Sequence, residues 1–107
     1  MLGVLSDERI DQALRSEVVG RIGCHDAGRP YVVPITYAYD GIAIYGHSTE
    51  GRKLHMIRAN PYVCFEVEQV DDLANRRSVI AWGEFEQLIG DEEQRALQLL
   101  VNRSGAA

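Results

Sequence analysis

Five segments rich in β-branched and aromatic residues recur along the chain, and turn-forming residues separate most of them. Such segments are typical of strands, and the spacers between the first three are short enough to form hairpins. The dipeptide Asp40-Gly41 is the strongest of these turn signals. Because hairpins join antiparallel neighbours, the pattern predicts an antiparallel sheet. The expected strands are residues 18–25, 30–39, 42–47, 62–70 and 78–89.

Three stretches with helical signals accompany the strands. Ser6 before Asp7 and Glu8 favours a helix start, and Asp91 with Gln94 resembles a capping box. We expect residues 71–77 to be a polar connection and Gly83 to be a bulge or a bend. The whole chain, residues 1–107, is therefore predicted to be one mainly β, α+β domain, a small antiparallel barrel with peripheral helices. The apolar stripes of the later helices are Leu54, Met56 and Ile57, ended by Asn60 and Pro61, and then Leu97, Leu100 and Val101.

Length and charge exclude several classes of function. A chain of 107 residues supports one core, and its net charge of -5 argues against a nucleic-acid-binding surface. The apolar start is too short for a secretory signal, and no stretch has membrane-spanning length. Cys24 and Cys64 lack metal-site or disulfide spacing, so we expect a cytoplasmic protein with no metal and with both cysteines as small core residues.

The stretch "GHSTEGRKL", residues 46–54, resembles a phosphate-binding loop. Its glycines have the spacing of the nucleoside-triphosphate loop, but Arg52, Lys53 and Leu54 follow Gly51, so the lysine is displaced by one position and the magnesium-binding hydroxyl is missing. The stretch is either a chance match or a site for a simpler phosphate, held by charge and backbone amides without a metal. The alternative is a solvated basic turn in which Thr49 caps a helix.

The order of four segments resembles a known family. They are "GRPYVVPITYAY", "IYGHSTEGRKL", "RANPYVCFEVE" and "RRSVIAWGEFEQL". Together they are similar to the FMN-binding split β-barrel related to pyridoxamine 5'-phosphate oxidase, and in particular to its nitroimidazole-resistance-like subgroup. The resemblance covers residues 8–100 and implies a homodimer with two FMN sites across the subunit interface. It also implies a further strand after residues 91–102, which this sequence lacks.

The resemblance implies a set of FMN-binding residues. Arg52 and Lys53 match the phosphate-binding position, at the first turn of a helix where free amides also favour an anion. Ser48 and Thr49 are expected to add hydroxyl donors. The remaining cofactor-binding candidates are Pro34, Ile35, Thr36 and Tyr37, whose backbone would meet the edge of the flavin ring, and Arg77 and Ser78, near the ribityl chain and the phosphate.

Two of these assignments have simpler alternatives. Tyr37 is equally explained as an ordinary strand residue, and Arg77 as a solvated residue at a strand entrance. His47 is the only polar side chain near the expected flavin that titrates close to neutrality, so it is the catalytic candidate for proton transfer and also a flavin contact. It could instead be packed at a strand end.

Three functions remain open. The first is an FMN-dependent oxidoreductase that passes reducing equivalents from NADH or NADPH to a small planar acceptor such as a nitroaromatic or a quinone. The second is a flavin-binding module without turnover. The third is a barrel that handles haem or another small ligand. The resemblance makes the first our leading hypothesis.

Overall fold

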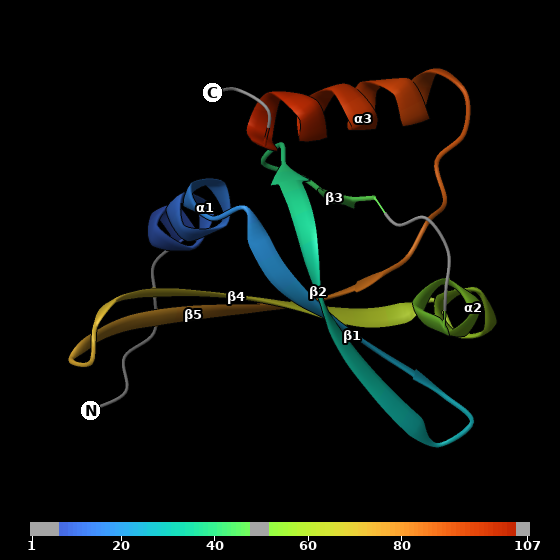
Figure 1. The fold of residues 1–107 in the computed structure, drawn as a ribbon, viewed down its shortest axis with the longest axis horizontal. Helices are drawn as coiled ribbons and strands as arrows, with labels where there is room; N and C mark the ends of the chain where they lie inside the picture. The colour runs from blue at the N-terminus through green and yellow to red at the C-terminus, as the bar shows by residue number, and fades with distance from the viewer. Residues whose placement is uncertain (1–6, 48–51, 105–107) are drawn as a thin grey trace.

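Five antiparallel strands form one sheet, in the order β3-β2-β1-β4-β5 (Figure 1). The computed structural model describes residues 7–47 and 52–104, and the side chains of residues 52, 53 and 104 lie outside the description. The antiparallel α+β fold expected from the sequence is confirmed. The strands are β1 Val19–Asp26, β2 Arg29–Tyr39, β3 Ile44–Gly46, β4 Tyr62–Asp72 and β5 Asn75–Glu84, and the helices are α1 Asp7–Ser16, α2 Arg52–Ala59 and α3 Asp91–Ser104.

The two predicted hairpin turns form as local chemistry requires. Between β1 and β2, Ala27 and Gly28 both have positive φ angles, 51° and 78°, which suits a tight hairpin turn. Between β2 and β3, the Asp40 carboxylate accepts the amides of Ile42 and Ala43, each at 2.8 Å. These hydrogen bonds hold the pKa of Asp40 below its ordinary value, and the bond from the Ala43 amide has the largest effect.

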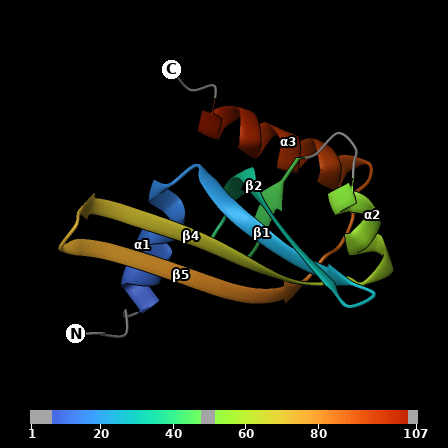
Figure 2. The ribbon, with the colours of Figure 1, turned by 60° about the horizontal axis from the view of Figure 1, so that its bottom comes forward.

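All three helices pack on one face of the sheet, which we call the inner face (Figure 2). Ala13 and Leu14 of α1 join a buried cluster with the inward residues of β2, β4 and β5, and Met56 and Ile57 of α2 join a second cluster around Cys24. Ala96 and Leu100 of α3 are also buried. No described helix therefore covers the opposite face, which we call the outer face.

The hairpin of β4 and β5 is longer than the sequence suggested. The expectation of a polar connection over residues 71–77 is wrong, because β4 continues to Asp72, β5 begins at Asn75, and Leu73 and Ala74 form the turn. The Asp72 carboxylate accepts the amides of Ala74 and Asn75 at 2.7 and 3.0 Å, which closes the turn locally. The hairpin arm projects away from the rest of the sheet (Figure 1).

Three other expectations need correction. β5 ends at Glu84 and not at residue 89, because its neighbour β4 begins at Tyr62. Beyond Glu84, the Phe85 amide still donates to the Pro61 carbonyl at 2.7 Å. Gly83 pairs in register with Val63, and the irregularity of the ladder lies between residues 70 and 72. Val101 is not in the buried stripe of α3, since 59% of it is exposed.

Candidate functional site

The outer face of the sheet is apolar although the described helices leave it uncovered. Trp82 is 79% exposed, Tyr62 68% and Val32 63%. Strand pairing places Trp82, Cys64, Gly23 and Val32 side by side in one row across four strands. An apolar sheet face of this size is expected to be covered by a ligand or by another chain. Its exposed residues include Val19, Arg21, Val32, Pro34, Thr36, Tyr62, Ile80 and Trp82.

Gly23 lowers the middle of this row. A Cβ atom added at Gly23 would lie 2.8 Å from the Cys64 Sγ atom, so a larger residue would require the Cys64 side chain to shift. Between Val32 and Trp82, the row therefore has only the small side chain of Cys64. A flat aromatic ring could lie against such a surface, with Trp82 beside it.

A polar pair lies in the next row. Pro34, Arg21, Glu66 and Ile80 are neighbours on successive strands, and Arg21 Nη1 lies 3.2 Å from Glu66 Oε1. This exposed pair adds little stability. It does supply hydrogen-bonding groups next to the apolar row of Val32 and Trp82.

The predicted strand contacts divide between the two faces. Pro34 and Thr36 are exposed on the outer face, whereas Ile35 points inward and packs against the core. Tyr37 is fully buried, and its backbone amide donates to the Val18 carbonyl at 3.0 Å. Side-chain contacts with an outer-face ligand are therefore open to Pro34 and Thr36 but not to Ile35 or Tyr37.

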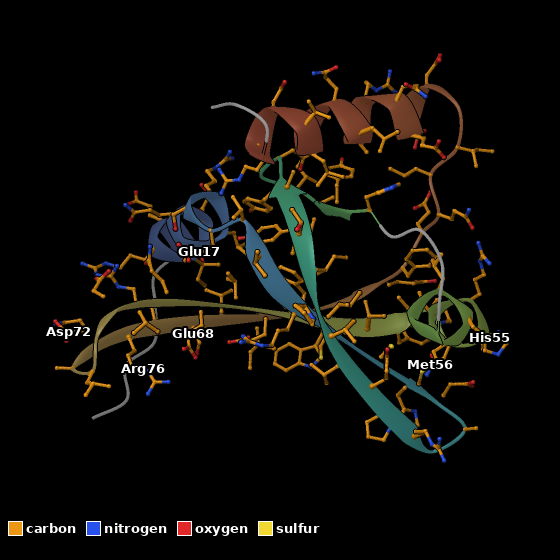
Figure 3. The ribbon with its side chains drawn as sticks, viewed as in Figure 1. Glu17, His55, Met56, Glu68, Asp72 and Arg76 are labelled. Carbon is orange, nitrogen blue, oxygen red and sulfur yellow. The ribbon has the colours of Figure 1, made fainter. Side chains whose placement is uncertain are left out.

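The basic residues of the predicted phosphate site begin a helix. Arg52 and Lys53 are the first two residues of α2, and their side chains lie outside the described residues, as do Ser48 and Thr49 entirely. Met56 and Ile57 pack the helix against the sheet, while His55 is exposed on the side of the helix that faces away from the sheet (Figure 3). After the helix, Asn60 Nδ2 donates to the His25 carbonyl at 2.8 Å, which fixes α2 beside the end of β1.

Arg77 and Ser78 lie far from α2 within one chain. Ser78 is six residues before Glu84 at the α2 end of β5, a span of about 20 Å. Figure 1 shows α2 at one end of the sheet and the hairpin arm at the other. A single copy thus does not bring these two residues to the start of α2.

Arg77 also has a structural partner. Its Nη1 atom donates to Gln69 Oε1 at 3.2 Å, and Gln69 in turn donates to Ser16 Oγ at 3.0 Å. These two hydrogen bonds connect the hairpin arm to the end of α1. Ser78 is exposed on the outer face opposite Glu68, so of the two it is the one placed to meet a ligand there.

His47 follows β3 and lines a different feature, a cavity of about 720 Å³ on the inner side of the sheet. Most of the cavity wall is apolar. Glu84, Glu86 and Glu93 also line it, and so do His47 and Leu54, the described side chains on either side of the stretch that holds Arg52 and Lys53. His47 therefore lines the inner cavity, which Trp82 of β5 also borders.

Sequence reasoning indicated more apolar strand surface than so short a chain can cover, but it did not locate the outer face. The signal was present in "VIAW", residues 79–82, and in "YVV", residues 31–33, where apolar residues do not alternate with polar ones. A strand that is apolar on both sides is expected to be covered on both sides.

Among the described helices, none is both long enough and apolar enough to cross a membrane. A family model described as pyridoxamine 5'-phosphate oxidase matches residues 6–106. A curated relative, an uncharacterized protein of Rhizobium meliloti (strain 1021), is 31% identical over 85 residues. That match covers 79% of this chain but only 56% of the relative.

Solved structures share the fold. A FAD-binding protein from Mesorhizobium loti superposes with a TM-score of 0.79 at 34% identity, covering 95% of this chain and 78% of that one. A candidate 5-nitroimidazole antibiotic resistance protein from Bacteroides thetaiotaomicron superposes with a TM-score of 0.83 at 26% identity, covering 94% of this chain and 68% of that one.

Proposed function

Because the chain belongs to the pyridoxamine 5'-phosphate oxidase family, we propose that it is a flavin-binding split-barrel protein that passes reducing equivalents to a small planar acceptor. The electron donor in this proposal is NADH or NADPH, and the acceptor is a nitroaromatic or a quinone. The observation that carries the proposal is the exposed apolar outer face. The start of α2, which packs on the inner face, adds the basic residues Arg52 and Lys53.

The outer face has the shape and chemistry that a flavin ring needs. Its shallow centre at Gly23 accommodates a flat ring, and the aromatic side chain of Trp82 lies in the same row. On β2, Pro34 lies in the row next to this centre and Thr36 in the row after it, so the strand can offer backbone groups to the polar edge of the ring. The FAD-binding structural relative supports a flavin as the ligand class.

FMN is the proposed form because of the start of α2. The amides of the first turn have no partners within the helix and favour an anion. Arg52 can hold two phosphate oxygens, while Lys53 adds a point charge. Ser48 and Thr49 precede them in sequence and remain proposed hydroxyl donors.

A second copy of the chain would complete the site. Ser78 and the start of α2 are far apart within one copy. Ser78 lies on the outer face, and α2 lies at one end of the sheet. Packing two outer faces together would cover Trp82, Tyr62 and Val32 and would bring the arm of one copy toward α2 of the other. We therefore propose a homodimer whose two flavin sites are shared between subunits.

The bound flavin would supply the redox chemistry, since it accepts two electrons from a reduced nicotinamide and donates them to the acceptor. This chain's residues would bind and orient it and exclude water from one side.

A non-catalytic flavin-binding protein is the second candidate, favoured by one observation: His47 lines the inner cavity and not the outer face. His47 as a proton donor remains part of the first proposal only.

Absorbance of the purified protein, and release and identification of any ligand, test the proposal first. We expect flavin bands and released FMN. Anaerobic addition of NADH or NADPH should then bleach those bands, and a nitroaromatic or a quinone should restore them. Bound flavin that is never bleached would support the non-catalytic candidate. Haem bands, or no flavin uptake at micromolar FMN, would refute both.

A further inference from the structure

Arg21 lies beside the part of β2 that the proposed flavin site uses. In the sheet register it is the direct partner of Pro34 on β2 and of Glu66 on β4. Directly opposite residues of antiparallel strands have Cβ atoms about 5 Å apart. Arg21 is also two residues from Gly23 along β1, a separation of roughly 7 Å. The long side chain of Arg21 can therefore reach a ring that lies over Gly23 with its polar edge toward Pro34.

One ion pair sets the direction of the Arg21 side chain. Its Nη1 atom donates to Glu66 Oε1 at 3.2 Å. The Arg21 side chain is exposed on the outer face, and that of Glu66 is partly buried. A guanidinium has five N–H donors, so one hydrogen bond to Glu66 leaves donors for a ligand. The carboxylate thus holds the guanidinium on the outer face without using all of its hydrogen-bonding capacity.

Other charged groups of the site have different places. Glu68 and Arg76 lie toward the hairpin arm and pair with each other, with Arg76 Nη2 3.5 Å from Glu68 Oε2. Arg52 and Lys53 belong to the start of α2 and are assigned to the phosphate, which the ribityl chain separates from the ring. Arg21 is thus a described basic side chain placed next to the polar edge of the ring itself.

The polar edge of a flavin ring changes its charge on reduction. The oxidised ring is neutral. When it takes up two electrons and one proton, it becomes an anion whose charge is shared between N1 and the C2 oxygen, both on the pyrimidine edge. A fixed positive group near N1 stabilises that anion and raises the reduction potential. A guanidinium beside Pro34 has the charge and the position for this effect.

We propose that Arg21 contacts the pyrimidine edge of the bound flavin and raises its reduction potential, while Glu66 orients the guanidinium and partly offsets its charge. A hydride from the reduced nicotinamide supplies both electrons and the proton, and the nicotinamide leaves oxidised. Arg21 stabilises the negative charge that the ring then carries. The inference rests on the proposed function and adds the residue pair that tunes it.

The reduction potential of the full chain loaded with FMN tests this. It is measured by anaerobic titration with dithionite in the presence of a reference dye. Arg21→Gln should weaken binding of reduced FMN about tenfold relative to oxidised FMN, which lowers the potential of a two-electron couple by about 30 mV. Glu66→Gln removes the offsetting carboxylate and should raise the potential. Both variants break the same ion pair, so a purely structural role of the pair would shift both potentials in the same direction.

Two further variants are controls. Arg21→Lys keeps the positive charge and should retain most of the wild-type potential. Arg15→Gln breaks a matched ion pair on α1, where Arg15 Nε lies 2.8 Å from Asp11 Oδ2. Because α1 packs on the inner face, this variant should leave the potential unchanged. Both ion pairs are exposed, so their loss should cost little stability and all four variants should fold.

The measurements separate this inference from the function on which it rests. Opposite shifts in Arg21→Gln and Glu66→Gln support it. An unchanged potential in Arg21→Gln, or a Glu66→Gln potential at or below that of the wild type, overturns it but leaves flavin binding in place. Failure of the wild-type chain to take up FMN overturns both.

Discussion

The Tyr37 hydroxyl donates a hydrogen bond of 2.6 Å to the main-chain carbonyl of Leu14, which joins β2 to α1 through the core. The ring of Tyr37 also meets Phe65 edge-on, with centroids 4.8 Å apart. Burial raises the pKa of Tyr37 to about 12 from its ordinary value of 10.0. A residue so placed stabilises the fold, and its hydroxyl and amide are already engaged in hydrogen bonds.

Replacing Tyr37 by phenylalanine should therefore lower stability. Tyr37→Phe leaves the buried Leu14 carbonyl without its donor, which costs about 1 to 3 kcal/mol of unfolding free energy. Urea unfolding at neutral pH measures this loss. FMN affinity should not change, and a large drop in affinity without a loss of stability would contradict our placement of Tyr37.

The same residue predicts an alkaline pH dependence. A pKa raised in the folded state means that the folded protein holds its proton more tightly, so this stabilisation is complete below pH 10.0 and is lost as pH rises toward 12. Wild-type unfolding free energy should fall over that window. In Tyr37→Phe this part of the fall should be absent, and an identical fall in both proteins would rule out the assigned pKa.

Two glycines of the sheet should respond oppositely to a methyl group. A Cβ atom on Gly20 would lie 2.9 Å from the Glu66 carbonyl oxygen and would also clash with the Phe65 ring, whereas one on Gly83 meets nothing within 4 Å. Gly20→Ala should thus cost about 1 to 3 kcal/mol of stability. Gly83→Ala is the matched control and should be neutral or slightly stabilising. Equal thermal shifts of the two variants would contradict the close packing of β1 on β4.

The phosphate proposal predicts a contrast between two flavins. Lys53→Ala should weaken FMN binding by roughly ten- to a hundredfold, because a charge-assisted hydrogen bond is lost. Riboflavin lacks the phosphate and should bind equally to both proteins. Quenching of flavin fluorescence gives the four affinities. The control is Arg58→Ala, the same loss of charge in the last turn of α2; an unchanged ratio of FMN to riboflavin affinity in Lys53→Ala would mean that the stretch is only a capped helix start.

The dimer proposal predicts that Trp82 is covered in solution. Trp82 is the only tryptophan of the sequence, so its fluorescence should shift to the blue as protein concentration rises and the outer faces meet. Trp82→Glu should raise the dimer dissociation constant at least about tenfold. Val101→Glu, which adds the same charge on the exposed side of α3, is the control. Sedimentation measures both, and a monomer at all micromolar concentrations of the wild type would end the proposal.

Local chemistry made much of the fold predictable. Asp40 and Gly41 close a turn with their own atoms, and Ala27 with Gly28 does the same, so the first three strands could be placed from the sequence. The boundaries of β4 and β5 could not. Whether residues 75–77 and 85–89 are strand depends on whether a partner lies opposite, and that partner is distant in sequence.

By itself the sequence determined the α+β class, the turns, the helix starts and the family, because each depends on short-range patterns or on the order of motifs. Only the tertiary structure decided which faces the candidate residues use. It separated Pro34 and Thr36 from Ile35 and Tyr37, and it placed Ser78 far from the start of α2. It also placed Arg21 between Pro34 and Glu66 on the outer face. Register and curvature, which depend on contacts between distant strands, determine these relationships.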